Sequence, residues 1–468
     1  MNKYKPVIGL EIHVELKTKS KMFCGCPAVF FGKKPNTQTC PVCLGLPGAL
    51  PVPNRKAIDW TILIGKALNC KINEVSKFDR KHYFYPDLPK GYQISQYDEP
   101  IAIDGSLKLK IKNEKLKIEE KTFRITRVHL EEDTGKLLHV GADTLVDFNR
   151  SGVPLVEVVT EPDFDNADDV KRFLEELQVI IRYLGVSDAD MEKGSMRLEP
   201  NISVRKLEVG SWELEERKKP QTSNHKPQTF LPKYKVEVKN INSFRFVKQA
   251  IEYEVERQIG ILEKGETPMQ ETRGFDDKKG ITYGQRSKEE AHDYRYFPEP
   301  DIPPMTFSKK YIEGIEVPEL PNQKVERYLK LGLRYSNAFT LTRNKKLNDL
   351  FEETTSKIKV QDKIQVTDIA NLLINKREFA NLSSEELYRK LKELKSPKQF
   401  DEKLLDTTIN QLIGVNKKAV EDYKKGKENA IMFLVGQVMG EMKGKADAKT
   451  VISKLKAQMS NPNLKSKN

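Results

Sequence analysis

The sequence alternates ionisable and apolar residues close to its beginning, and this alternation limits most strictly how the segment can fold. Glu11, His13 and Glu15 occupy every second position of the stretch VIGLEIHVEL at residues 7–16, and apolar residues stand between them. Successive side chains of a β-strand point to opposite sides of a sheet, so this period of two predicts a half-buried strand. The three ionisable side chains would then share one face, where they can bind a cation or transfer protons. A plain polar edge strand is the alternative interpretation.

Four of the five cysteines form a paired pattern that is typical of a structural zinc site. Cys24 and Cys26 are followed, after thirteen residues, by Cys40 and Cys43. Two short loops that each supply two thiolates match the tetrahedral coordination of structural zinc, and four unrelated thiols are the alternative. Five cysteines in 468 residues are too few for a disulfide scaffold, and we interpret Cys70 as a small core residue.

The pattern of the chain predicts an α+β protein with three regions. Residues 1–298 mix strands and helices: segments 154–160 and 235–239 predict strands, and segment 166–184 predicts a helix that ends at Gly185. A proline-rich break follows at 298–304, and we expect an all-α domain at 299–405. A small all-α tail domain is expected at 406–468. The polar stretch 206–233 is interpreted as a surface excursion.

Basic residues outnumber acidic ones, and the excess is concentrated in the tail. The chain has 81 Lys and Arg against 68 Asp and Glu, and residues 415–468 contain twelve Lys and five acids. This surplus favours a polyanionic partner, although a solvated surface without a partner is the alternative. Helical spacing predicts a small apolar core in the tail, formed by Ile431, Leu434, Val435, Val438 and Met442.

The first residues, MNKYKP, lead directly into the predicted strand, and no apolar run approaches the length of a membrane span. We therefore expect a cytoplasmic protein without a membrane partner.

Two further segments in the first region contain groups suited to binding or catalysis. Residues 78–100 combine aromatic, basic and acidic side chains in a loop-like setting, which suits nucleic-acid binding as well as an irregular loop packed by its own rings. Glu157 lies in the apolar strand LVEVV at 155–159, where a carboxylate is costly unless a cation is near. An ion pair with Arg150 is the structural alternative to a metal.

Several long motifs in this chain resemble those of one family, the B subunits of bacterial-type aspartyl/glutamyl-tRNA amidotransferases. The resemblance spans the whole chain and rests on VIGLEIHVEL (7–16), FDRKHYFYPD (78–87), GYQISQ (91–96), HLEED (129–133), VEVKNINSF (236–244), DYRYFPEPD (293–301), FLVGQVM (433–439) and KGKA (443–446).

The resemblance implies a ligase that forms a carbon–nitrogen bond and uses ATP, magnesium and structural zinc. It implies that the side-chain carboxylate of Glu-tRNA(Gln), Asp-tRNA(Asn) or both is phosphorylated and amidated in a catalytic cradle domain at 1–298. Ammonia would come from a partner amidase, the A subunit, and a small C subunit would complete a heterotrimer. The misacylated tRNA would also contact the tail, and the residues expected to bind it are Lys417, Lys418, Lys424, Lys425, Lys443 and Lys445.

The resemblance also implies a set of site residues. Glu11, His13, Glu132 and Glu157 are the candidates for catalysis and ATP binding, and the last three are candidate magnesium ligands. This fits the absence of a phosphate-binding loop of the form G-x-x-x-x-G-K-[ST] from the sequence. Lys81 and Lys90 resemble basic residues that line the exit of an ammonia tunnel, and a solvated or tRNA-facing role is the alternative for each.

One departure from the family and two rival functions remain open at the level of sequence. The segment RLEPN at 197–201 stands where many relatives have RCDAN, which leaves a metal role of Glu199 open. The rivals are an ATP-dependent carboxylate–amine ligase for a small molecule and a non-catalytic zinc-containing RNA-binding subunit. A small-molecule ligase has no need for the basic tail, and a purely RNA-binding protein leaves the acid-and-histidine cluster without a role.

Overall fold

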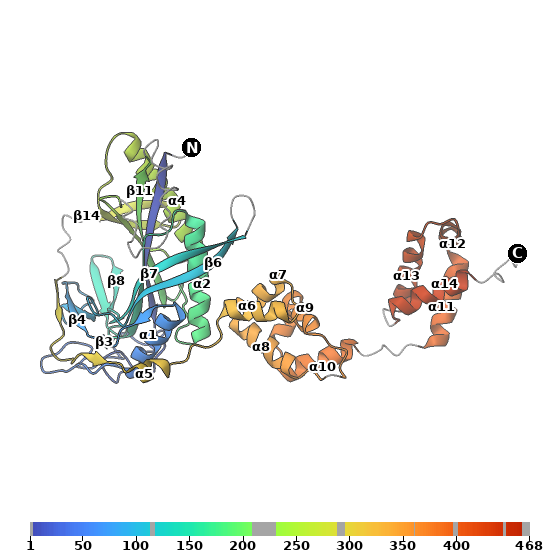
Figure 1. Cartoon of the computed structure of the whole chain (residues 1–468), viewed down its shortest axis with the longest axis horizontal. Helices are drawn as coiled ribbons and strands as arrows, with labels where there is room; N and C mark the ends of the chain where they lie inside the picture. Colours follow the sequence, from blue (N-terminus) through green and yellow to red (C-terminus); the bar gives the residue numbers. More distant parts are fainter. Residues whose placement is uncertain are drawn as a thin grey trace. The chain divides into compact units, whose positions relative to one another are not determined.

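The computed structural model of the chain describes residues 3–112, 118–207, 231–287, 295–359, 361–395, 401–442 and 446–460. The chain divides into two compact units (Figure 1). The first contains residues 1–330 and 338–345, and the second contains 331–337 and 346–468. The mixture of sheets and helices followed by a helical region confirms the predicted α+β class. The three-domain division at 298 and 405 stays a prediction.

A sheet of nine strands organises the first unit, and the strand predicted around His13 lies at its centre. The strand order is β14-β13-β12-β11-β1-β10-β7-β6-β2. All neighbours are antiparallel except β12 and β13, which are parallel. The strands are β1 (Tyr4–Glu15), β2 (Lys71–Ile72), β6 (Ala102–Lys112), β7 (Ile118–Glu132), β10 (Pro154–Thr160), β11 (Met196–Lys206), β12 (Val236–Lys239), β13 (Glu271–Asp276) and β14 (Ile281–Ser287).

Helices α1 (Arg55–Ala67), α2 (Ala167–Leu184) and α4 (Phe244–Glu263) pack on this sheet. The apolar side chains of β1 that alternate with its ionisable ones join the helices in one core. Burial of such a side chain contributes about 1.5–3 kcal/mol. These buried members of β1 are Ile8, Leu10, Ile12 and Val14. The ionisable side chains of β1 therefore belong to the opposite face of the sheet.

Helix α2 confirms the helix predicted at 166–184. The side chain of Asn166 caps its first turn by accepting a hydrogen bond from the backbone N–H of Asp169. Gly185 ends the helix with a φ of 71°, a left-handed conformation that glycine adopts without steric cost.

Smaller sheets complete the first unit, and one of them changes the interpretation of residues 78–100. The loop predicted for this segment is wrong for two stretches, β4 (Asp79–His82) and β5 (Tyr92–Ser95), which form a sheet with β15 (Arg295–Pro298). Residues 83–91 and 96–100 belong to no helix or strand. The two other small sheets pair β3 (Val75–Ser76) with β16 (Met305–Thr306) and β8 (Lys136–Val140) with β9 (Asp143–Asp147). Most of the stretch predicted as a surface excursion, residues 208–230, lies outside the described residues.

The chain after β16 is helical wherever the structure describes its regular elements. Short helices α5 (Lys309–Glu313) and α6 (Pro321–Lys330) belong to the first unit. The helices that follow are α7 (Tyr335–Thr342), α8 (Lys345–Ser356), α9 (Val366–Asn375), the 3-10 helix η2 (Arg377–Asn381) and α10 (Ser384–Lys395). No helix among the described residues is long and apolar enough to cross a membrane.

Four helices form the tail around a core of their own. They are α11 (Glu402–Val415), α12 (Lys417–Lys424), α13 (Asn429–Glu441) and α14 (Ala448–Met459). All five predicted core residues lie in this core, together with Leu405, Ile409, Val451 and Leu455. Helix α11 begins at Glu402 and contributes Leu405 to this core.

We expect Leu434→Ala to destabilise the tail, because Leu434 is 0% exposed at the centre of its core. A Leu→Ala change at such a site costs about 2–5 kcal/mol. Hydrogen exchange of the α13 amides in the full chain measures this loss. Phe433→Ala is the matched control, since the neighbouring Phe433 is 53% exposed. Equal acceleration of exchange in both variants would contradict the packing described here.

Candidate functional site

His13 lies at the centre of a cluster of ionisable side chains on the face of the sheet opposite the helices. The antiparallel register places His13 directly across from Glu157 on β10, and Glu157 directly across from His129 on β7. Glu131 follows two residues after His129 and therefore points to the same face. Strand pairing thus brings together four side chains that are distant in sequence.

The distances within this cluster suit cation binding. His13 Nε2 lies 3.5 Å from Glu157 Oε2 and 3.7 Å from Glu131 Oε1. His129 Nε2 lies 3.2 Å from the same oxygen of Glu157. The Ser95 hydroxyl donates a hydrogen bond of 3.0 Å to Glu131. The ligand atoms of His13, Glu131 and Glu157 all lie within 4.8 Å of one another, so these three residues can hold a metal ion.

The charges in the cluster stabilise one another despite their burial. Burial disfavours the charged form of Glu157, but His129 and His13 hold the pKa of this carboxyl well below its usual range. Burial likewise opposes protonation of His13, but the hydrogen bond and charge of Glu157 and the charge of Glu131 raise its pKa to about 9. Glu157 is therefore ionised at neutral pH, as a metal ligand must be.

Lys81 on β4 belongs to the same charged site. Burial alone would lower the pKa of the Lys81 ammonium, but the negative charges of Glu131 and Glu157 raise it above its ordinary value. The cluster therefore contains the positive charge of Lys81 beside its carboxylates, and this positive charge suits the binding of an anionic ligand.

Glu11 lies in a second acidic group on the same sheet face. Its neighbour across the sheet is Glu199 on β11, and one ligand atom of each of Glu11, Glu199 and Glu237 lies within 4.8 Å of the others. Burial and the charge of Glu237 raise the pKa of Glu199. Lys239 pairs with Glu199 at 3.1 Å. Glu199, whose role the sequence left open, thus stands where a second cation can bind.

Arg150 does not form the ion pair with Glu157 that the sequence allowed. Its guanidinium donates hydrogen bonds to the carbonyl oxygens of Thr134 and Gly135, and its Nε lies 3.7 Å from Asp133 Oδ2. This alternative for Glu157 is therefore wrong, and the partners of Glu157 are the two histidines.

Glu132 points away from His13 and Glu157, because it alternates with Glu131 along β7. One of its carboxylate oxygens pairs with Lys90 and accepts a hydrogen bond of 2.9 Å from the backbone N–H of Ile94. Lys90, Glu132, Cys24 and Cys43 are among the residues that line a cavity of about 110 Å³. The structure thus does not bring Glu132 into the cluster, and Glu131 stands in its place.

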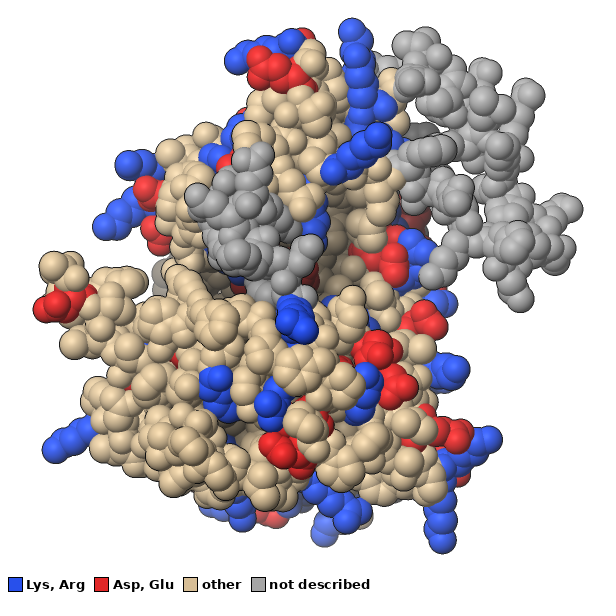
Figure 2. Space-filling model, turned by 90° about the vertical axis from the view of Figure 1, so that its left-hand side faces the viewer, with Lys and Arg blue, Asp and Glu red and all other residues tan. Residues whose placement is uncertain are grey.

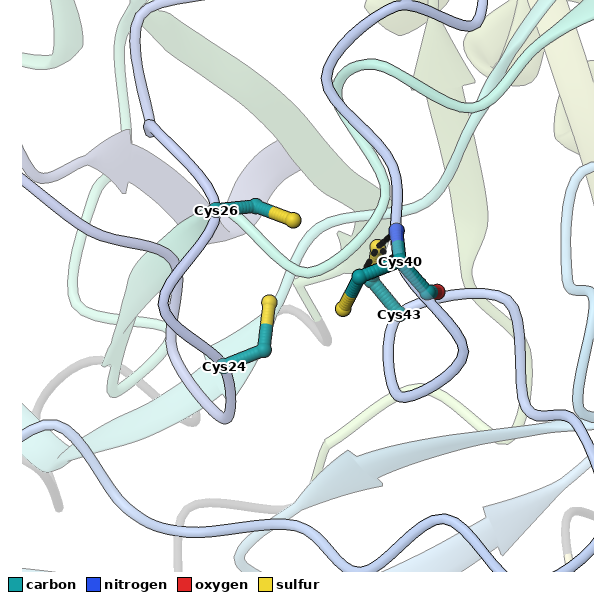
Figure 3. A group of neighbouring side chains, drawn as sticks. All are labelled: Cys24, Cys26, Cys40 and Cys43. Carbon is teal, nitrogen blue, oxygen red and sulfur yellow. Dashed lines mark hydrogen bonds between the residues drawn. The ribbon is translucent and has the colours of Figure 1, made fainter.

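The four cysteines predicted to form one site converge (Figure 3). The sulfurs of Cys24 and Cys26 face those of Cys40 and Cys43, and all lie within 4.8 Å of one another. The Cys43 sulfur accepts a hydrogen bond of 3.1 Å from the backbone N–H of Cys40 and lies 3.9 Å from the Cys40 sulfur. A hydrogen bond from Cys24 helps to lower the pKa of Cys43 to about 5. This arrangement can hold a metal ion.

The basic surplus of the chain is not gathered in one patch on the visible face of the first unit. Figure 2 shows Lys and Arg side chains interspersed with Asp and Glu on that face. In the tail, Lys417, Lys418, Lys424 and Lys425 are exposed on and beside α12. The two other lysines predicted to bind tRNA, Lys443 and Lys445, lie outside the described residues.

Of the predicted catalytic residues, the structure brings together His13, Glu157 and Lys81. Glu11 belongs to the adjacent acidic group, and Lys90 and Glu132 lie beside the cysteines. His129 and Glu131 were missed. A period of two applied to the motif HLEED would have placed both on one face and Glu132 on the other.

Two family models match the chain. The GatB/GatE catalytic domain matches residues 6–313, which include both acidic groups and the four cysteines. The GatB domain matches residues 368–459. The chain belongs to the GatB family.

Curated relatives support this assignment over nearly the whole length. The B subunit of the aspartyl/glutamyl-tRNA(Asn/Gln) amidotransferase of Thermotoga maritima is 44% identical, with 95% of this chain and 97% of the relative covered. Proteins of the same name from Thermosipho melanesiensis and Caldicellulosiruptor saccharolyticus are both 43% identical, and the matches cover 96% and 97% of this chain and 97% and 99% of those relatives.

For this GatB-family chain we expect Glu131→Gln to weaken the binding of a divalent cation by about tenfold or more, because it removes a charged ligand. Titration with Mn²⁺, followed by electron paramagnetic resonance, measures the change. Glu132→Gln is the matched control on the same strand, since its side chain points away from His13. Weakened binding in the control with normal binding in Glu131→Gln would reverse the assignment.

Proposed function

We propose that this chain is the B subunit of a glutamine-hydrolysing, tRNA-dependent amidotransferase. The near full-length match to relatives with that name carries the proposal. Its substrates would be Glu-tRNA(Gln), Asp-tRNA(Asn) or both, because the relatives' name gives both acceptors. The activity is formation of a carbon–nitrogen bond at the side-chain carboxylate of the misacylated amino acid.

The reaction requires activation of that carboxylate, because an oxide ion is a poor leaving group. A phosphoryl group moves to a carboxylate oxygen, ammonia attacks the acyl carbon and loses a proton, and phosphate leaves with the oxygen. ATP, when bound, would supply the phosphoryl group and leave as ADP, and magnesium would neutralise the phosphate charges.

The donor set around His13 fits a magnesium site. Glu131 and Glu157 provide carboxylate oxygens, the ligands that Mg²⁺ prefers, and hydrogen bonds and nearby positive charges keep both pKa values low. His13 lies beside both oxygens and would serve as a third ligand once the metal displaces the proton that Glu157 and Glu131 stabilise on its ring. Lys81 would orient the phosphate or the substrate carboxylate by its charge. Glu11, together with Glu199 and Glu237, would hold a second cation of the same ATP site.

Ammonia is proposed to come from a partner amidase, the A subunit, with a small C subunit completing a cytoplasmic heterotrimer. The cavity lined by Lys90 and Glu132 is large enough for a molecule the size of ammonia or water. We place Lys90 and Lys81 along the route of ammonia to the acyl carbon.

An assay of the reconstituted three-subunit complex with both charged tRNAs tests this function. Amide formation and tRNA-dependent ATP hydrolysis are the expected results with at least one of them. Glu157→Gln should lower both by about two to four orders of magnitude, because it removes a metal ligand. Hydrolysis of glutamine by the partner should persist at a reduced level. Near-normal amidation by Glu157→Gln, or no amide from either tRNA, would refute the proposal.

We also propose that the four-cysteine site holds structural zinc. Tetrahedral zinc with Zn–S bonds of about 2.3 Å requires sulfurs about 3.8 Å apart. The 3.9 Å between the Cys40 and Cys43 sulfurs fits this requirement. A closed set of four thiolates leaves no open position for a substrate, which supports a structural role.

Cys26→Ser should lower the zinc content and the melting temperature together, because zinc binding stabilises the folded state. Metal analysis by mass spectrometry and thermal denaturation measure the two effects. Cys70→Ala is the control, since Cys70 lies outside the cluster and should keep one zinc per chain. Less than about half an equivalent of zinc in the unaltered protein would contradict the zinc assignment.

The tail is proposed to bind the body of the tRNA through its lysines. Lysines contact phosphates as point charges and read no sequence. Replacing Lys417, Lys418, Lys424 and Lys425 with Gln should raise the KM for charged tRNA. Each lost phosphate contact should also flatten the log–log salt dependence of tRNA binding by about 0.7–0.9. A salt series measures the slope, and the four Lys→Arg changes are the charge-preserving control. Identical slopes for the Gln and Arg variants would leave the tail without this role.

A further inference from the structure

Lys21 is a buried lysine beside the four-cysteine site. It is 1% exposed, and its Nζ lies 3.7 Å from Cys43 Sγ and 3.3 Å from the carbonyl oxygen of Phe148. Within the part of the chain that the structure describes, no carboxylate forms an ion pair with Lys21. Of the two groups that the Lys21 ammonium contacts, the Cys43 sulfur is therefore the one that can carry a negative charge.

A buried ammonium is costly unless an opposite charge lies near it. A neutral thiol offers only a weak acceptor, so the position of Lys21 suits an ionised sulfur. Four thiolates around one divalent cation carry a net charge of about −2, and this charge is also buried at a cost. The positive charge of Lys21 and the negative charge of the metal-bound thiolates thus stabilise each other, and burying either one alone would be costly.

The main chain fixes the position of Lys21 relative to the sulfurs. Its backbone N–H donates a hydrogen bond of 2.9 Å to the carbonyl of Cys26, in the same loop as two of the cysteines. Its own carbonyl accepts a hydrogen bond of 3.2 Å from the Asn54 side chain. These hydrogen bonds hold the backbone of Lys21 beside the cluster, and burial of the side chain restricts the positions that its ammonium can take.

We propose that Lys21 is the counter-cation of the four-cysteine site and raises its affinity for zinc by donating a hydrogen bond to the Cys43 sulfur. This inference rests on the zinc site proposed above. Lys21 would not touch the metal; it would act through the charge on one of the ligands. Partners of this kind commonly change metal affinity by about 10–100-fold.

The test is the zinc affinity of the full chain, measured by competition with a chromophoric chelator. Lys21→Met removes the charge at similar volume and should weaken zinc binding by about tenfold or more. Lys21→Gln keeps an N–H donor without the charge and should fall between Lys21→Met and the unaltered protein. Lys19→Met is the matched control, because Lys19 is exposed in the same segment, and should leave the affinity unchanged.

Two outcomes separate this inference from the zinc proposal. If the unaltered chain binds one zinc and both Lys21 variants bind it as tightly, the role of Lys21 is overturned and the zinc site stands. If the unaltered chain binds no zinc, the zinc proposal and the role of Lys21 both fail.

A second readout is the rate at which a thiol-alkylating reagent releases zinc. Removing the Lys21 ammonium leaves more negative charge on the sulfurs, which makes them react faster with the reagent. Faster release in Lys21→Gln than in Lys19→Met supports the role, and equal rates oppose it.

Discussion

The antiparallel pairing of β1 with strands on both sides is the constraint on which the site depends. It gives His13 two fixed neighbours across the sheet, Glu157 on β10 and Arg197 on β11. The apolar side chains that alternate with His13 hold the strand against the helices, so the hydrophobic core also fixes the charged face. Burying these charges is costly, and their mutual hydrogen bonds and opposite signs offset that cost. Packing on one face therefore sets the electrostatics of the other.

Much of the fold followed from local patterns in the sequence. The segments predicted at 154–160 and 166–184 correspond to β10 and α2, because their boundaries depend on nearby residues such as Asn166 and Gly185. The tail core followed from helical spacing alone. The pairing of β15 with β4 was not predictable in this way, since β15 lies about two hundred residues further along the chain. A local pattern contains no information about such a partner.

The same distinction applies to the site. The spacing of the four cysteines is a local signal, and the structure brings these residues together. The choice between Glu131 and Glu132 depends on which face of β7 meets His13, and that is set by the register with β10. The separation of Glu11 from His13 likewise depends on β11, which places Glu199 across from Glu11. The sequence indicated which kinds of side chain form the site. Which of these residues lie together depends on the register of the strands, which the sequence does not show.

Two consecutive carboxylates of β7 serve two different places in the molecule. Glu131 meets the histidines, whereas Glu132 meets Lys90 beside the cysteines. A strand reverses its faces when it shifts by one residue. A single insertion or deletion in β7 upstream of this pair, if absorbed by a shift of register, would move each glutamate to the opposite face and disturb both places at once. The length of this strand is therefore as restricted as its composition, and we expect variation in chain length to collect in the loops that flank it.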